Sequence, residues 1–249
     1  MRKSIVIGGI VAILAIGGTA FAWFWFSGGS GEPSTELTTP TIAGQTTTTQ
    51  ATTTTPDEGE TTTTVADTSG GAFVIQADES LATFTLDEVL RGEPKTVVGT
   101  TSELAGQFVL DLSDLSQTQF SDIVVNARTF TTDSSTRDRA IRGPIILNSA
   151  TDEFEFITFV VTDATGLDGS AEVGDTFEFT LIGDLTIKGV TNEVEFDVTA
   201  TLGDDSTVEG IAETEVLRSD YGIGIPSVAS VADVTDEVQL QLDFVASSA

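Results

Sequence analysis

The side chains that could carry out acid–base or ionic chemistry in this sequence are carboxylates and a few arginines. Arg137 directly precedes Asp138, and Arg218 stands two residues before Asp220. Such pairs can form salt bridges, bind the oxygens of a head group or, where two carboxylates converge, act as acid and base. The 249 residues include no histidine and no cysteine, so an imidazole base, a thiolate nucleophile and a Cys/His zinc site are excluded. Most hydrolytic triads are excluded with them.

The element that must position Arg137 and Asp138 is a short helix. They lie in SSTRDRAIRGP, residues 134–144, where serine offers an N-cap and Gly-Pro ends the segment. At the rim of a ligand site the two side chains would meet a quinone or phosphate head group. In the alternative interpretation they anchor the helix through salt bridges and backbone contacts.

A second candidate polar site lies near the C-terminal end of the chain. Arg218 and Asp220 can pair in the same structural way, and Tyr221 offers an apolar ring with a polar hydroxyl end. The chain carries 39 acidic against 10 basic residues, a formal net charge of -29. This charge repels nucleic-acid phosphate and anionic lipid head groups, so we expect no nucleic-acid partner.

Alternation of apolar and polar residues dominates the sequence from Phe73 to the C-terminus. In Gly183–Val198, GDLTIKGVTNEVEFDV, two alternating runs flank the step Lys188-Gly189, which predicts two antiparallel strands joined by a tight turn. The same alternation predicts about eight or nine strands, including 73–77, 81–90, 97–112 (bent at Gly99 or Gly106), 122–130, 154–163 and 206–217.

The interior faces of these strands are rich in phenylalanine and leucine. In "FEFITFVV" the apolar parity slips between Phe156 and Phe159, which predicts a β-bulge there. The inward positions that we expect to form the wall of an apolar site are Phe108, Leu110, Phe156, Phe177, Phe179, Leu181 and Leu185. Gly183 faces inward as well, either to admit a ligand or neighbouring strand or to relieve curvature.

An all-β domain with one polar face must hide the other face. It does so either by packing two sheets together or by closing one sheet into an antiparallel β-barrel of about eight strands. A sandwich core is solid, whereas such a barrel is filled by side chains or holds one small apolar ligand. The residues alone leave both interiors open.

The first 26 residues predict a membrane segment. Arg2 and Lys3 precede an uncharged stretch, residues 5–26, which as a helix would rise roughly 33 Å and span a bilayer with its C-terminal side outside the cytoplasm. The alternative is a signal peptide cleaved after Ala20-Phe21-Ala22, which leaves a secreted or periplasmic protein. Residues 27–72 are rich in threonine without a hydrophobic period and predict a disordered stalk with a root-mean-square span of about 37 Å.

Three motifs resemble segments of a known protein family. GDLTIKGVTNEVEF (183–196), TDSSTRDRAI (132–141) and VLRSDYGIG (216–224) resemble, in order and spacing, segments of the YceI-like polyisoprenoid-binding family. The resemblance covers residues 73 to about 245. It implies a lipocalin-like antiparallel β-barrel, exported in bacteria, that holds a quinone tail or polyprenyl chain in an apolar tunnel. The sequence departs from the family at ADESLATF and NSATDEFEF, where a polar head-group contact would be affected.

The sequence therefore predicts a binding protein that is not an enzyme, with an apolar lipid or isoprenoid as ligand and with no metal or other cofactor. A domain of residues 73–249 would be tethered outside the cytoplasmic membrane as a carrier or reservoir. The alternative is a structural or adhesive surface domain with a filled core. A carboxylate enzyme using Asp138 or Asp220 ranks below both, because the inward positions offer no pair of carboxylates. The oligomeric state is not predicted.

Overall fold

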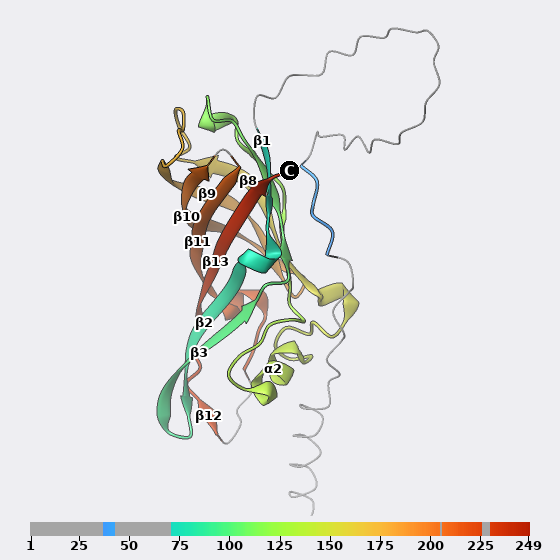
Figure 1. The fold of residues 1–249 in the computed structure, drawn as a ribbon. Coiled ribbons are helices and arrows are strands. Elements are labelled where there is room, and N and C mark those ends of the chain that lie inside the picture. Colours follow the sequence, from blue (N-terminus) through green and yellow to red (C-terminus); the bar gives the residue numbers. More distant parts are fainter. Residues whose placement is uncertain (1–36, 43–70, 205, 226–229) are drawn as a thin grey trace, which may run out of the picture.

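The computed structural model describes residues 37–42, 71–204, 206–225 and 230–249 (Figure 1). The predicted membrane segment, residues 1–26, and most of the predicted stalk, residues 27–72, lie outside these ranges. Within the described ranges no helix combines the length and the apolar character needed to cross a bilayer.

The described chain is mostly β-strand, which confirms the all-β class. One α-helix lies in the described ranges, α2 (Ser135–Arg142), together with four short 3-10 helices, η1 (Ala77–Glu79), η2 (Leu115–Gln117), η3 (Asp152–Phe154) and η4 (Arg218–Tyr221). The strands are β1 (Gly71–Ile75), β2 (Leu81–Leu90), β3 (Glu93–Thr101), β4 (Leu104–Ala105), β5 (Gln107–Leu110), β6 (Gln119–Phe120), β7 (Ile123–Asn126), β8 (Phe156–Thr165), β9 (Thr176–Ile187), β10 (Val190–Asp204), β11 (Thr207–Leu217), β12 (Val231–Ala232) and β13 (Glu237–Ser248).

These strands form one curled antiparallel sheet. Its main path runs β4-β7-β8-β9-β10-β11-β13-β1-β5-β6, and the hairpin β2–β3 extends from β13. Figure 1 shows the long strands β8 to β11 and β13 side by side and bent around an interior, with α2 near the β2–β3 hairpin at one end. The curl turns the apolar faces of β8 to β11 and β13 toward that interior.

The predicted closed barrel of about eight strands is wrong in one respect, because the sheet is a thirteen-stranded half-barrel whose path ends at β4 and β6. The predicted long strand 97–112 is divided into β3, β4 and β5. Leu104 pairs with Val125 but Phe108 pairs with Phe120, a register shift of one residue around Gly106. A Cβ at Gly106 would lie 2.5 Å from the Cδ1 atom of Ile123, so a larger residue would require that side chain to move.

The predicted bulge in β8 also lies elsewhere. The register between β8 and β9 shifts between Val161 and Asp163, and not between Phe156 and Phe159. The reason is that η3 ends just before the strand, so the alternation begins with Ile157 as the first inward residue. Phe156 is half-buried beside its cross-strand partner Asn126.

The hairpin β9–β10 matches its prediction. Ile187 pairs with Val190, so Lys188 and Gly189 form a two-residue turn, with φ angles of 53° and 76°. Both angles lie in the left-handed region that a type I′ turn requires and that glycine adopts without strain. The turn fixes which residues of β9 and β10 face inward.

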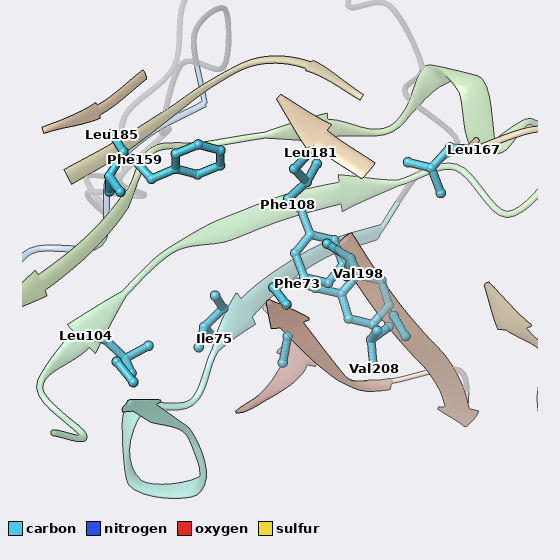
Figure 2. Packing of buried hydrophobic residues seen from close by; sticks show 14 of the residues in the cluster. Phe73, Ile75, Leu104, Phe108, Phe159, Leu167, Leu181, Leu185, Val198 and Val208 are labelled. Carbon is cyan, nitrogen blue, oxygen red and sulfur yellow. The ribbon is translucent and has the colours of Figure 1, made fainter. Parts of the chain in front are cut away.

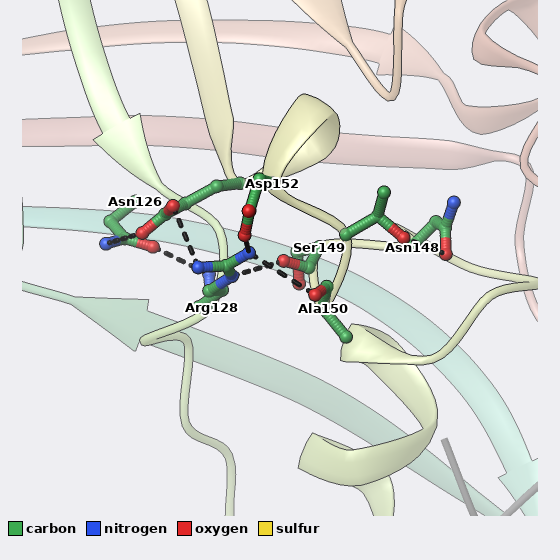
Figure 3. A network of polar contacts seen from close by, with 8 residues as sticks. Asn126, Arg128, Asn148, Ser149, Ala150 and Asp152 are labelled. Atoms are coloured by element: carbon green, nitrogen blue, oxygen red, sulfur yellow. Dashed lines mark hydrogen bonds and ion pairs between the residues drawn. The ribbon is translucent and has the colours of Figure 1, made fainter. Parts of the chain in front are cut away.

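An ion-pair network around the buried Arg128–Glu155 pair, not predicted from the sequence, holds the loop between β7 and β8. The Arg128 guanidinium contacts Glu155 at 2.8 Å and Asp152 at 2.5 Å, and its Nε donates to the Ser149 carbonyl at 2.6 Å. Asn126 donates to the second oxygen of Glu155. Figure 3 shows Arg128 between these groups. Arg128 and Glu155 side chains are each 5% exposed, so the network ties the loop firmly to the end of the sheet.

A short piece of the predicted stalk, residues 37–42, lies against the folded domain. Ile42 is 3% exposed, and the Gln107 side-chain amide donates to the Pro40 carbonyl at 2.8 Å. In Figure 1 this segment is the blue trace. The described part of the stalk is therefore in contact with the sheet near β5.

The core lies inside the curl. Figure 2 shows side chains from β1, β5, β8, β9, β10 and β11 converging on it. The rings of Phe73 and Phe108 stack there, 5.4 Å apart between centroids. Because neighbouring strands are antiparallel and in register, the phenylalanines and leucines of alternate positions meet in one continuous apolar cluster.

Candidate functional site

The interior of the curled sheet contains a partly open cavity of about 160 Å³. Its wall comes from β1, β2, β5 to β11 and β13, with residues of the intervening loops. The lining residues are Ile75, Ala82, Thr83, Phe108, Leu110, Thr118, Phe120, Ile123, Val125, Phe130, Ile157, Phe159, Leu167, Phe177, Phe179, Leu181, Leu185, Ile187, Phe196, Val198, Ala200, Val208, Ala212, Leu240, Gln241, Leu242 and Phe244.

This wall carries no charged side chain among the described residues, and its polar residues are two threonines and one glutamine. The Gln241 amide is already engaged, since it donates to the Asp243 carboxylate at 2.9 and 3.1 Å. The Thr118 hydroxyl is buried and has no hydrogen-bond partner in the described part of the chain. Such a cavity favours hydrocarbon and disfavours any ionised group.

Small residues in the sheet make the space. Ala200 and Ala212 line the cavity on neighbouring strands, where larger side chains would fill it. Gly183 and Gly210 each accept an aromatic ring instead: a Cβ at Gly183 would lie 2.8 Å from the ring of Phe159, and one at Gly210 would lie 2.8 Å from the ring of Phe244. Of the alternatives given for Gly183, the structure favours close approach of a neighbouring strand, because the absence of a side chain leaves room for β8 and the ring of Phe159.

Aromatic rings shape the remaining space. The ring of Phe159 meets that of Phe196 edge-on, with centroids 4.9 Å apart. The ring of Phe120 lies 6.1 Å from Phe108 and 6.2 Å from Phe179. Pairs at these separations attract one another beyond their buried area, so the rings hold defined positions.

Six of the predicted wall residues line the cavity, and one does not. The six are Phe108, Leu110, Phe177, Phe179, Leu181 and Leu185. The exception is Phe156, which stands at the first position of β8, with the opposite parity to the lining residues Ile157 and Phe159.

Arg137 and Asp138 do not line the cavity. Arg137 pairs with Glu88 of β2 at 2.7 Å and also with Asp133. Asp138 accepts hydrogen bonds from the backbone N–H and the hydroxyl of Thr132, at 2.8 and 2.7 Å. These contacts match the structural interpretation, in which the two residues anchor α2 to the sheet.

Tyr221 is 1% exposed, but it belongs to the core beside the cavity and not to its wall. Its hydroxyl has no hydrogen-bond partner in the described ranges, and burial raises the pKa of this phenol above its ordinary value of 10.0. The predicted pair of Arg218 with Asp220 is wrong. Arg218 lies 3.6 Å from Asp236 and donates to the carbonyls of Thr235 and Ile223, because η4 turns its side chain toward that loop.

Sequence reasoning did not select several residues of the wall. Phe196, Val198 and Ala200 follow the alternation of β10, so the signal for them was present. Phe120 lies on a strand of only two residues, which is too short for an alternating pattern to reveal. Ala212 is a small inward-facing residue, and the sequence alone does not tell whether such a residue lines a cavity or packs in a filled core.

Comparison with known proteins supports this fold. The family model described as the YceI-like domain matches residues 73–246. The crystal structure of BcnA from Burkholderia cenocepacia is similar to this fold, with 18% sequence identity and a TM-score of 0.53. The match covers 69% of this chain and 98% of that chain. A polyisoprenoid binding domain from Saccharophagus degradans, implicated in plant cell wall breakdown, is 12% identical, with a TM-score of 0.54 over 72% of this chain and 99% of that chain. No curated protein matches the chain.

Proposed function

Because the chain belongs to the YceI-like domain family, as its motifs predicted, we propose that its cavity binds a polyisoprenoid or a similar apolar lipid. The observation that carries this proposal is a cavity of about 160 Å³ whose wall holds no charged side chain. The polyisoprenoid binding domain from Saccharophagus degradans, which has the same fold, supports the choice of ligand.

The size of the cavity sets the strength of such binding. A water molecule needs roughly 10–15 Å³ on this scale, so the space holds about a dozen carbon atoms. At about 0.8 kcal/mol per buried CH₂, a chain that fills it gains on the order of 10 kcal/mol before the costs of association and ordering are subtracted. Costs of about 4 kcal/mol or more leave at most about 6 kcal/mol, so we expect a dissociation constant of tens of micromolar or weaker.

The place of action in this proposal is the outer face of the cytoplasmic membrane. The basic residues Arg2 and Lys3 before the uncharged stretch 5–26 support an N-terminus kept in the cytoplasm, with the domain outside. There the protein would act as a carrier or reservoir for a chain too apolar to diffuse through water.

Binding in this proposal needs no catalytic group. The wall of the cavity offers no carboxylate among the described residues, so the two converging carboxylates of a lipocalin-like isomerase have no place there. The competing function is a structural or adhesive surface domain without a ligand. The ring contacts inside the curl favour it, because they fill part of the space.

Organic extraction of the full chain purified from its native host, followed by mass spectrometry, tests the proposal. We expect an apolar lipid in the unmodified protein and none in Phe179→Lys, which places an ammonium in the wall. Thr180→Lys is the matched control, because Thr180 faces outward on the same strand and contacts Asp197. Absence of lipid from the unmodified protein, or equal lipid in Phe179→Lys and the control, would favour the ligand-free surface domain.

A further inference from the structure

We propose that residues 37–42, the docking segment, bind the outer face of β1 and β5 and thereby hold the domain close to the membrane. This face lies on the opposite side of the sheet from the cavity, so the docking does not depend on the binding of a ligand. Only the membrane part of the inference rests on the proposed function, through the place of action given there.

One outward side chain of β5 is covered. The lining residues Phe108 and Leu110 point into the cavity. Gln107 and Val109 alternate with them along the strand and therefore point outward. Val109 is nevertheless 2% exposed, and it does not belong to the hydrophobic cluster inside the curl. A side chain on the outer face of a sheet is buried only where another part of the chain lies over it.

The docking segment is the part of the chain that reaches this position. The Gln107 side-chain amide donates to the Pro40 carbonyl at 2.8 Å. Ile42 stands two residues after Pro40 and is 3% exposed, and it too lies outside the cluster inside the curl. Val109 stands two residues after Gln107, so a segment that runs along β5 places Ile42 over Val109. In Figure 1 the trace of the docking segment follows β1, the neighbour of β5.

The rest of this outer face suits an uncharged partner. Ala72 and Val74 of β1 are the cross-strand partners of Val109 and Gln107, and both are half-buried. None of these four side chains carries a charge. The docking segment, LTTPTI, is uncharged as well. In a chain with a formal net charge of -29, this contact therefore avoids the like-charge repulsion that the acidic residues impose.

Docking shortens the connection to the membrane. Only ten residues, 27–36, separate the predicted membrane segment from the docking segment. Ten residues rich in glycine and serine have an expected root-mean-square span of about 17 Å, against about 37 Å for the whole predicted stalk. Fully extended they reach at most about 36 Å. The outer face of β1 and β5 is therefore kept near the bilayer surface.

Thiol labelling of the full chain tests the docking, because the chain has no cysteine of its own. Ile42→Cys places a single thiol at the covered position, and Thr41→Cys, at an exposed neighbour, is the matched control. We expect a maleimide to react about tenfold or more slowly with Ile42→Cys than with the control, because the covered thiol reacts only when the segment leaves the sheet. Adding Val109→Thr, which keeps the shape of valine but places a hydroxyl under the segment, should reduce the difference.

Energy transfer to lipid tests the short connection. The full chain in nanodiscs carries a donor dye at Gln119→Cys, an exposed position that pairs with Val109 on the same face, and acceptor lipids mark the bilayer surface. Ile42→Asp should release the segment and lower the transfer, because the expected span to the membrane rises from about 17 to about 37 Å. Thr41→Asp adds the same charge at an exposed position and should leave the transfer unchanged.

The outcomes separate this inference from the proposed function. Equal labelling rates of Ile42→Cys and Thr41→Cys would overturn the docking, and equal energy transfer in Ile42→Asp and Thr41→Asp would overturn the short connection. Neither result affects the binding of apolar chains in the cavity. A full chain that does not insert into nanodiscs would refute the proposed place of action and the short connection with it, whereas the labelling result would still decide the docking.

Discussion

Filling the cavity from its wall is the most specific test of the site. Ala212 on β11 lines the cavity, is 7% exposed and lies between its cross-strand partners Val198 and Leu242. Ala212→Phe would place a phenyl ring of six carbons into the space. Because the ring enters existing room, the variant should fold.

The magnitude follows from the volume. The cavity holds about a dozen carbons, and the new ring takes the place of about six of them. At about 0.8 kcal/mol per excluded CH₂ the lost binding free energy is about 3–5 kcal/mol, where the lower figure allows for movement of the wall. The dissociation constant of a twelve-carbon alcohol should therefore rise between a hundredfold and several thousandfold.

Competition binding with that alcohol, together with urea unfolding, separates loss of the site from loss of the fold. The control is Ile211→Phe, because Ile211 is the neighbouring residue of β11, faces outward and is 41% exposed. We expect unchanged binding in the control and a change in unfolding free energy below about 3 kcal/mol in Ala212→Phe. Binding that survives in a folded Ala212→Phe would refute the assignment of the cavity as the site.

Three further predictions concern the fold that shapes the cavity. Arg128→Ala removes the guanidinium that neutralises the buried Glu155 carboxylate and should lower the unfolding free energy by about 3–5 kcal/mol in urea; a loss below about 1 kcal/mol would contradict the role given to the network. Gly183→Ala places a Cβ 2.4 Å from a backbone oxygen of β8 and should cost about 1–3 kcal/mol, whereas in Gly203→Ala the Cβ has 3.7 Å of room and stability should hardly change. Tyr221, the only tyrosine, has a raised pKa in the folded state, so the unfolded phenol loses its proton first and stability should fall as the pH rises above about 10. In Tyr221→Phe that part of the fall should be absent when urea unfolding is compared at pH 9 and 11, and an unchanged pH dependence would show that burial of this phenol has no such effect.

The sequence predicted the features that depend on local patterns, such as strand alternation, tight turns and helix ends. Alternation in β9 and β10 fixed the turn at Lys188-Gly189 and the inward face, since the period of a strand and the geometry of a two-residue turn are local properties. The helix α2 began and ended where the serine and glycine signals stood. Family motifs then identified the domain, which the match over residues 73–246 confirms.

What the sequence missed depends on contacts between distant residues. The break between β4 and β5 lies at Gly106, where an added Cβ would meet the side chain of Ile123, a residue 17 positions away. Phe156 was predicted to line the wall within a strand 154–163, but η3 occupies the start of that range and the inward residues of β8 begin with Ile157. Whether Arg137 meets a ligand or Glu88 is decided by where β2 passes, which no local pattern records.

The central claim is that the interior of the curled sheet holds an empty apolar cavity. Crystallography of the unmodified protein under xenon pressure tests it most directly, because xenon binds in empty apolar cavities. The account predicts a strong anomalous peak inside the curl, against Phe159, Leu185 and Phe196. A structure without xenon there, with the rings packed into the space, would contradict it.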